Sequence, residues 1–535
     1  MVFHIAKKEF LTNLLSARFL IGFVLCLVLT PFSLLVNIDD YREKAKLYQL
    51  DRDAAEARLK STRVFSGLKP EIILPPEPLS LFNRGITGQV GNRIKILLGE
   101  KPLLAEGRAA TRDNPFLDAF FSIDFVDIAA IIFSLLALLF SYDAVTKEKE
   151  SGTLGLQVSN PIGRARLLAG KIAGILLTLL PILFFTFLLG AVIVLLSRDV
   201  ALGGLDWTRI GLVSAVSLLY MTVFAFAGLF VSARSRTSVA SLVVCLFLWV
   251  FFVFLVPNLA SYAAESFVRA QPRDNLTRVL ADMDKAREER ISAAAKSLPK
   301  PDWNMNWYSN GGSDGYIENY GCTKSFFEWY RARAIFSEPL RLDTADKKWA
   351  PQESNLDSLS RQAKAAETMA IVSPAGVFRG IASALCGTDR RAHEADMARA
   401  RGHRETFIRN LKGKDIFASF RWFTPTPPET FRTADELIDL RSGGRFKTLA
   451  EYDSWAAEQK DFRAQWEVLR KVKVRGDKPD DFSFLDLSDL PRPPPRPASL
   501  RLGIEGSVAG IGLLLVEAVF LFYLGYIAFL RYDVR

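Results

Sequence analysis

Residues 124–142 read DFVDIAAIIFSLLALLFSY, residues 143–171 read DAVTKEKESGTLGLQVSNPIGRARLLAGK, and residues 172–196 read IAGILLTLLPILFFTFLLGAVIVLL. The first and third segments are apolar, and each approaches the roughly 20 helical residues needed to cross a bilayer core about 30 Å thick. The segment between them is too polar to enter lipid and too short to form a domain. The stretch therefore predicts two membrane-spanning helices joined by a polar loop.

Four further apolar runs of similar length occur at 18–38, 208–231, 238–261 and 506–530. The run at 18–38 contains Pro31 and lacks a small-residue cleavage site, so we interpret it as a retained anchor and not as a signal peptide. Residues 1–17 place apolar side chains at helical spacing with charges between them, which indicates an amphipathic helix at the membrane surface. The sequence thus predicts an α-helical polytopic membrane protein with six transmembrane helices.

The distribution of Lys and Arg predicts the topology. They concentrate before the first run, in 143–171 and after the last run, whereas the loop 197–207 holds only Arg198 beside two aspartates. Short loops rich in positive charge stay in the cytoplasm. Both termini and 143–171 are therefore expected there, with two extracytoplasmic, mainly helical mixed domains at 39–123 and 262–505. The net charge of +10 is partly this topology signal, and the charge of the second domain is too diffuse for a nucleic-acid patch.

Within the two outer domains, the pattern favours strands in 86–98 and helices at 275–297, 355–370, 388–412 and 450–472. The stretch WNMNWYSNGGSDGYIENYGC (303–322) is typical of an irregular loop. The chain has four cysteines and no CxxC pair. Cys322 and Cys386 both fall in the second outer domain. They would form a disulfide if that domain faces an oxidising space and their geometry allows it, and both alternatives stay open.

The polar segment 143–171 has the size and polarity of a docking element for a soluble partner. Two acids occupy a short helix, a Gly-Thr pair breaks it, an amphipathic stretch follows, and basic residues lead into the next run. The residues concerned are Glu148, Glu150, Gly152, Thr153, Leu154, Arg164 and Lys171. The alternative is a solvated turn between two spans.

At these residues the sequence resembles a known family. The pattern YDAVTKEKESGTL (142–154), then NPIGRARLLAGK (160–171), then a long apolar run, is similar to the ABC-2 type permeases, the membrane subunits of ABC transporters of the type V exporter architecture. VPNLASYAA (256–264), SPAGVFRGIASALCGTDRRAH (373–393) and FLRYDVR (529–535) resemble a subgroup with a large extracytoplasmic domain between spans five and six.

The resemblance implies that 143–171 is the coupling segment that seats on an ATPase. Glu148, Glu150, Gly152, Thr153 and Leu154 match the family's acidic-Gly-Thr-Leu element, and Arg164 and Lys171 match its basic positions. These charges would pair with one another or with charges on the ATPase. The implied partners are two copies of an ABC ATPase that bind ATP and Mg, a second permease subunit in a homodimer or heterodimer, and the lipid of a bacterial inner membrane.

Signatures of catalysis are missing from the sequence. No GxxxxGK[ST] phosphate-binding loop occurs, and the three histidines form no HExxH. We therefore predict no catalytic residue and no metal ligand, and expect a transport subunit without its own ATPase site that exports an unidentified substrate. Two alternatives remain: a mechanotransmission complex that moves the outer domains against a partner protein or lipid, and a membrane-anchored extracytoplasmic enzyme.

Glu517 lies near the middle of the last apolar run, in GIGLLLVEAVFLFYLGY (510–526). A carboxylate at this depth is costly, so it is expected to face the helix bundle, a dimer interface or a water-filled path. Its role would be a substrate path or gating contact, or a hydrogen bond to a neighbouring helix. Asp127, near the end of the second run, is expected to reach the membrane interface.

Overall fold

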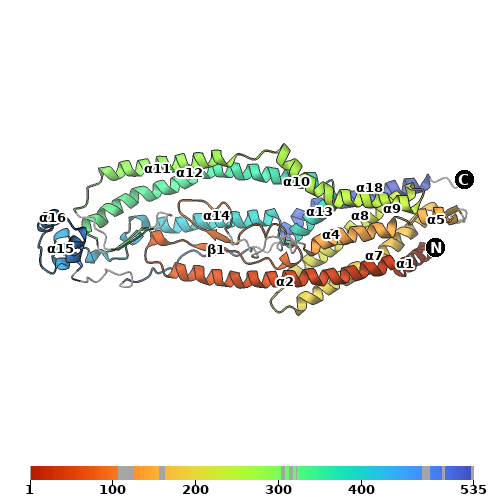
Figure 1. The fold of residues 1–535 in the computed structure, drawn as a ribbon, viewed down its shortest axis with the longest axis horizontal. Helices are drawn as coiled ribbons and strands as arrows, with labels where there is room; N and C mark the ends of the chain where they lie inside the picture. The colour runs from red at the N-terminus through yellow and green to blue at the C-terminus, as the bar shows by residue number, and fades with distance from the viewer. Residues whose placement is uncertain are drawn as a thin grey trace.

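The computed structural model describes residues 2–106, 124–155, 163–302, 308–311, 317–320, 322–470, 472, 482–496 and 500–531. These residues form an elongated, almost entirely helical molecule (Figure 1). Six of its helices are long and apolar enough to cross a membrane: Ala17–Lys60, Phe125–Glu150, Arg164–Leu196, Gly204–Arg234, Ser238–Phe267 and Leu500–Leu530. The predicted fold class, an α-helical polytopic membrane protein, is confirmed.

The membrane half is built from α1 (Val2–Leu14), α2 (Ala17–Lys60), α4 (Phe125–Ser141), α5 (Thr146–Glu150), α7 (Arg164–Leu196), α8 (Gly204–Arg234), α9 (Ser238–Val250), the π-helical turn η3 (Phe251–Leu255), α10 (Val256–Phe267) and α18 (Leu500–Leu530). Helix α2 continues well past its apolar run because charges of opposite sign follow at helical spacing, as in the Asp40–Lys44 pair at 2.8 Å. The six spans are numbered below in chain order: α2, α4, α7, α8, α9–η3–α10 and α18.

The other half contains η1 (Phe65–Gly67), β1 (Glu71–Ile73), η2 (Pro78–Leu81), β2 (Arg93–Lys95), α11 (Arg273–Ser297), β3 (Tyr308–Gly311), β4 (Ile317–Tyr320), α12 (Lys324–Ala370), α13 (Pro374–Cys386), α14 (Arg390–Gly413), η4 (Ile416–Ala418), η5 (Phe420–Trp422), η6 (Pro428–Thr430), α15 (Ala434–Ser442), α16 (Leu449–Glu458) and α17 (Phe462–Leu469). Strands β1 and β2 pair antiparallel with Ile72 opposite Ile94.

The expectation of an irregular loop over 303–322 is wrong for two short stretches. Strands β3 and β4 pair antiparallel, and Tyr308 lies opposite Tyr320. Tertiary hydrogen bonds hold β4: the backbone N–H of Asn319 donates to the carbonyl of Phe423 at 2.9 Å, and the Thr424 hydroxyl donates to the carbonyl of Asn319 at 2.7 Å. Long-range partners therefore outweigh the turn-rich composition, which local sequence reasoning cannot foresee.

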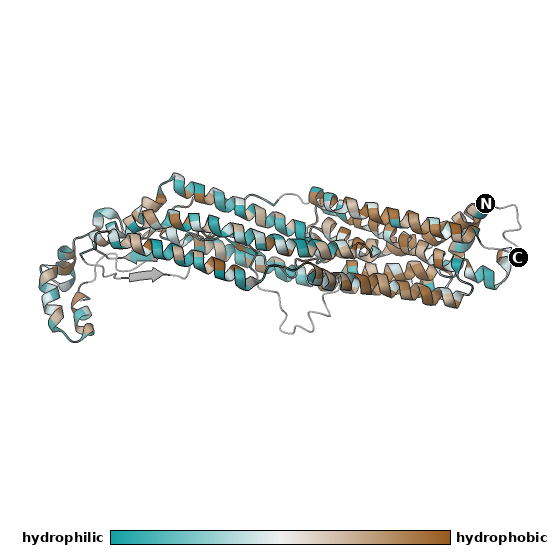
Figure 2. Cartoon of the chain, turned by 90° about the horizontal axis from the view of Figure 1, so that it is seen from above, coloured by the Kyte–Doolittle hydropathy of each residue, from teal (hydrophilic) through white to brown (hydrophobic). Residues whose placement is uncertain are grey.

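Hydropathy divides the molecule along its long axis. Apolar residues dominate the half that carries both chain termini, and polar residues dominate the half that ends at α15 and α16 (Figures 1 and 2). We call this second half the distal unit, made of the described residues within 61–77, 92–106, 268–372 and 387–496. Helix α12 runs along it for 47 residues, a length of about 70 Å at 1.5 Å per residue.

The distal unit has one hydrophobic core drawn from both predicted outer domains. Ile72, Ile94 and Ile96 of the first segment are buried in the same cluster as Phe327 and Phe407 of the second. The two segments, which are separated in sequence by four spans, therefore form one packed unit and not two separate domains. Hydropathy shows which segments leave the membrane, but it contains no information on whether they then pack together.

Helix α13 departs most from its expected place. It falls in the predicted second outer domain, yet its apolar residues are buried in the cluster formed by the spans. The ring of Phe378 stacks on that of Tyr220 in α8, with centroids 4.6 Å apart. At 13 residues it is too short for the spanning-helix criterion, so its hydrophobicity did not distinguish it from a buried helix of a soluble domain.

The possible disulfide between Cys322 and Cys386 is not formed. Cys386 ends α13 and is buried in the cluster of the spans, whereas Cys322 is buried in the core of the distal unit. The insertion of α13 among the spans is what separates them.

Candidate coupling site

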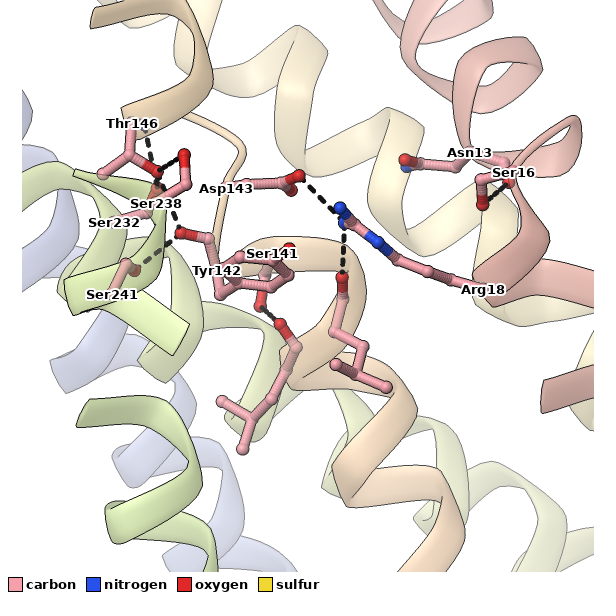
Figure 3. Close-up of polar contacts among 12 residues, drawn as sticks. Asn13, Ser16, Arg18, Ser141, Tyr142, Asp143, Thr146, Ser232, Ser238 and Ser241 are labelled. Atoms are coloured by element: carbon pink, nitrogen blue, oxygen red, sulfur yellow. Dashed lines mark hydrogen bonds and ion pairs between the residues drawn. The ribbon is translucent and has the colours of Figure 1, made fainter. Parts of the chain in front are cut away.

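The predicted coupling segment lies at the end of the bundle that carries both chain termini (Figure 1). The Ser232 hydroxyl, in the last turns of α8, accepts hydrogen bonds from the backbone N–H groups of Val145 at 3.0 Å and Thr146 at 3.2 Å. The Ser241 hydroxyl of α9 donates to the carbonyl of Tyr142 at 2.6 Å (Figure 3). Spans four and five thus bind the backbone that leads into α5.

Two charged side chains of α5 occupy the ends of two span helices. The Lys149 Nζ donates to the carbonyls of Ala233 at 2.5 Å and Ser235 at 3.0 Å, at the carboxyl end of α8. Glu150 accepts from the Ser238 backbone N–H at 2.9 Å and from the Ser238 hydroxyl at 2.6 Å, at the amino end of α9. Each charge has the sign that the helix dipole favours at that end. Sequence reasoning singled out Glu150 but missed Lys149.

Glu148 and Lys171 form a buried ion pair with a third member. The Lys171 Nζ lies 2.8 Å from Glu148 Oε1 and 3.0 Å from Glu9 Oε1, and only 1% of the Lys171 side chain is exposed. The sequence left open whether these charges pair with one another or with charges on an ATPase. Glu148 and Lys171 pair with each other. Glu9 of the amphipathic helix α1 joins them, which the sequence did not predict.

Small residues allow α1 to approach span three closely enough for this contact. A Cβ added to Gly174 of α7 would lie 2.5 Å from Glu9 Cβ, and one added to Gly170 would lie 2.7 Å from Ile5 Cβ. The amphipathic helix thus packs against α7 and links the N-terminus to the coupling segment.

The chain turns at Gly152, directly after α5, where φ is +69°. Glycine adopts this left-handed conformation without a steric cost. Thr153 is exposed, and its hydroxyl lies 2.8 Å from that of Ser151. Leu154 is 1% exposed and packs in a small cluster with Val145 and Phe529. The rest of the predicted amphipathic stretch, residues 156–158, lies outside the described residues.

A family model matches the part of the chain that contains this segment. The family model described as "ABC-2 family transporter protein" matches residues 3–295, more than half of the chain. The chain belongs to the ABC-2 transporter family. The match contains α1, the coupling segment and the first five spans, and it ends within α11.

Two curated relatives of this ABC-2 chain are each named "Probable ABC transporter permease protein NosY". The protein from Pseudomonas aeruginosa is 33% identical over 130 residues, which are 24% of this chain and 46% of the relative. The protein from Stutzerimonas stutzeri is 38% identical over 101 residues, which are 19% of this chain and 37% of the relative. The matches span less than half of either relative.

Arginines join further parts of the ABC-2 fold to the coupling segment. Arg18 at the start of α2 pairs with Asp143 at 2.8 Å, donates to the Leu139 carbonyl at 3.3 Å, and lies 4.9 Å from the centre of the Tyr142 ring (Figure 3). Arg164 at the start of α7 donates to the carbonyl of Leu530, at the carboxyl end of α18, at 2.5 Å. Spans one and six are thereby tied to the same region.

Glu517 lies half-buried in α18, away from this site. Its Oε2 atom is buried without a hydrogen-bond partner among the described residues, so that oxygen does not make the expected bond to a neighbouring helix. Its function stays a prediction. Asp127 pairs with Arg379 of α13 at 2.9 Å.

A second buried charge network joins the spans of this ABC-2 chain to the distal unit. Arg209 in α8, 4% exposed, lies 3.0 Å from Glu77 Oε1, and Arg496 lies 2.8 Å from Glu77 Oε2 and 2.9 Å from Asp396. Burial raises the pKa of the Glu77 carboxyl above its ordinary value, an effect that the two arginines oppose. The network joins the segment after span one and the segment before span six to span four.

Proposed function

We propose that this ABC-2 chain is the permease subunit that couples ATP hydrolysis by a separate ATPase subunit to the export of an unidentified substrate. The observation that carries the proposal is the attachment of α5 to the carboxyl end of span four and the amino end of span five through Lys149 and Glu150. A protein that moves α5 would act on both helices together, because the contacts are charged and directed at helix termini.

The proposal places α1, α5 and both termini in the cytoplasm of a bacterial cell and the distal unit outside its inner membrane. The support is the concentration of Lys and Arg in the short loops on the α5 side. Large apolar side chains that are exposed on α2, α9 and α18 would contact lipid or a second permease subunit. Two ATPase copies would bind ATP and Mg beneath a homodimer or heterodimer.

Purification of the tagged full-length chain from its native host in mild detergent tests the proposal directly. We expect a separate protein with nucleotide-binding motifs to copurify, identified by mass spectrometry. A second permease in the same sample would indicate a heterodimer. Recovery of this chain alone after crosslinking, at every salt concentration, would contradict the coupling role.

Replacement of Glu150 by alanine is expected to uncouple the ATPase without unfolding the permease. The change removes two exposed hydrogen bonds to Ser238, which contribute little to stability in water, so the chain retains its fold. Gly152→Val should act similarly, because a left-handed φ costs a side chain about 1–2 kcal/mol and no atom obstructs the new Cβ.

The measurement for both variants is the ATPase rate of the complex divided by that of the isolated ATPase, together with the amount of ATPase bound. Glu505→Ala is the matched control, since Glu505 makes an exposed pair with Arg501 at the start of α18. If Glu150→Ala and Gly152→Val bind and stimulate the ATPase as Glu505→Ala does, the segment does not couple the two subunits.

A second function, mechanotransmission, is favoured by the distal unit itself. Its two segments share one core, and α12 alone extends about 70 Å. Such a unit would transmit motion to a partner protein or lipid outside the membrane, with no substrate crossing. ATPase activity in proteoliposomes that rises only on addition of an extracytoplasmic protein would favour this function, whereas stimulation by a transported solute would favour export.

A further inference from the structure

Two sequence segments that the coupling site does not use meet at the boundary between the spans and the distal unit. One is VPNLASYAA (256–264) in span five, and the other is SPAGVFRGIASALC (373–386), which includes α13. A π-helical turn, Phe251–Leu255, interrupts span five just before Pro257. Such turns often occur at functional positions.

Pro257 leaves this turn with one backbone donor fewer. Proline has no N–H, and residue 257 would be the donor to Val253 in an α-helix or to Phe252 in a π-helix. Both carbonyls receive hydrogen bonds from the other segment: the Ser373 hydroxyl donates to the Phe252 carbonyl, and Arg379 Nη1 donates to the Val253 carbonyl at 3.5 Å. Carbonyl groups left without donors in a membrane are costly, so these contacts stabilise the turn.

The same arginine also binds another span. Arg379 Nε donates to Asp127 Oδ1 in the first turn of α4 at 2.9 Å. One guanidinium group, presented by α13, therefore joins span two to the π-helical turn of span five. Ser373 has a second contact as well, because its hydroxyl accepts the N–H of Gly376 at 3.1 Å and so caps α13.

Helix α13 packs closely against two more spans. Phe378 stacks on Tyr220 of span four, and the Tyr220 hydroxyl donates to the Ala130 carbonyl of span two at 2.7 Å. In span six, a Cβ added to Gly510 would lie 2.7 Å from Ile381 Cγ1, so the Ile381 side chain packs directly on the backbone of that helix. A displacement of these spans must displace α13 with them.

At its other end, α13 is joined to the long helix of the distal unit. Only residues 371–373 separate α12 from α13. A Cβ on Gly376 would lie 2.5 Å from the Ala370 carbonyl oxygen, so the first turn of α13 packs on the last residue of α12. Because α12 is a continuous helix of 47 residues, it would carry a rotation of α13 to the far end of the distal unit.

We propose that α13 is the element through which the spans move the distal unit, and that Arg379 and Ser373 are positioning residues that hold it to the π-helical turn of span five. The inference rests on the proposed function, because the spans must first respond to an ATPase. It adds the element that transmits movement from the spans to the distal unit. It applies to export and to mechanotransmission alike.

The test uses the full-length permease with its copurified ATPase in lipid nanodiscs. Spin labels at Ser454→Cys on α16 and Glu505→Cys at the start of span six report the distance between the distal unit and the spans, since both positions are exposed and the native cysteines are buried. We expect the distance distribution to change when nucleotide is trapped with vanadate. Arg379→Met should lose at least half of that change, and Ser373→Ala should reduce it.

Arg379→Lys keeps the charge opposite Asp127 and a donor for the Val253 carbonyl, and it should restore the response. The matched control is Arg390→Met, which removes an arginine that binds Glu367 and Glu394 on the distal unit. ATPase binding and melting temperature are measured for every variant. If the nucleotide-dependent distance change recovers in Arg379→Lys while ATPase binding is unchanged, Arg379 acts by positioning and not by maintaining the fold. Ser373→Ala tests the same contact independently if Arg379→Met does not fold.

The inference is overturned if Arg379→Met and Ser373→Ala respond to nucleotide as the wild type does, or if the wild type keeps one distance in all nucleotide states. In either case, normal binding and stimulation of the ATPase would leave the proposed coupling function intact. Absence of a bound ATPase would instead contradict the proposed function itself.

Discussion

Lys171→Met is expected to lower the free energy of unfolding by about 3–5 kcal/mol, the cost of removing one partner from a buried ion pair. The lysine side chain is 1% exposed and separates Glu148 from Glu9, which are 14% and 19% exposed. Without it, two carboxylates share a site that has little access to water. Repulsion between them should loosen α1 and α5 from α7, so ATPase binding should fall together with stability.

Denaturant titration in mixed micelles measures the effect, and Arg501→Ala provides the comparison. Arg501 pairs with Glu505 at the same 2.8 Å, but its side chain is 89% exposed, so its loss should leave stability almost unchanged. Adding Glu148→Gln and Glu9→Gln to Lys171→Met should recover much of the stability, because no uncompensated charge remains. Equal costs for Lys171→Met and Arg501→Ala would show that the ion pair is not buried in the folded membrane protein.

Gly228→Val is expected to prevent α4 and α8 from packing in their present positions. A Cβ on Gly228 would overlap the Ser141 hydroxyl oxygen and lie 3.1 Å from Ser141 Cβ, and Ser141 is completely buried. Overpacking costs about 1–3 kcal/mol when side chains can adjust. Here α4 and α8 must move apart. We therefore expect a destabilisation at the upper end of that range or above it, with loss of folded protein in membranes.

Gly211→Val on the same helix is the matched control, because nothing lies within 4 Å of its added Cβ. The yield of monodisperse protein and its melting temperature should stay near wild type for Gly211→Val and fall sharply for Gly228→Val. Adding Ser141→Gly removes the obstructing side chain and should partly restore Gly228→Val. A Gly228→Val protein as stable as Gly211→Val would contradict the close contact of α4 with α8.

Residue pattern was sufficient to predict the helical membrane fold, since each apolar run is long enough to reveal a span by itself. It was also sufficient to single out Glu148, Glu150 and Lys171, whose charges stand out beside apolar runs. It could not give their partners. Glu9 and Ser238 lie far from the segment in sequence, and their contacts with it depend on how α1 and α9 pack.

Helix α13 shows a second limit of sequence reasoning. Its 13 residues are too few to span a membrane, so its length gave no reason to take it out of the predicted outer domain. The arginine lies among the spans because two partners satisfy it: Asp127 and the Val253 carbonyl. The loss of a donor at Pro257 is visible in the sequence, but the segment that replaces the donor is more than a hundred residues away.

The shared core of the distal unit also sets the order of events during synthesis. Ile72, Ile94 and Ile96 leave the ribosome long before Phe327 and Phe407, with which they are buried. At about 5–20 residues per second, the first segment waits roughly 12–65 seconds for those partners, while four spans are inserted between them. Throughout that interval its apolar side chains face water. With the topology proposed above, a folding helper that binds newly translocated chains would find its substrate in this segment.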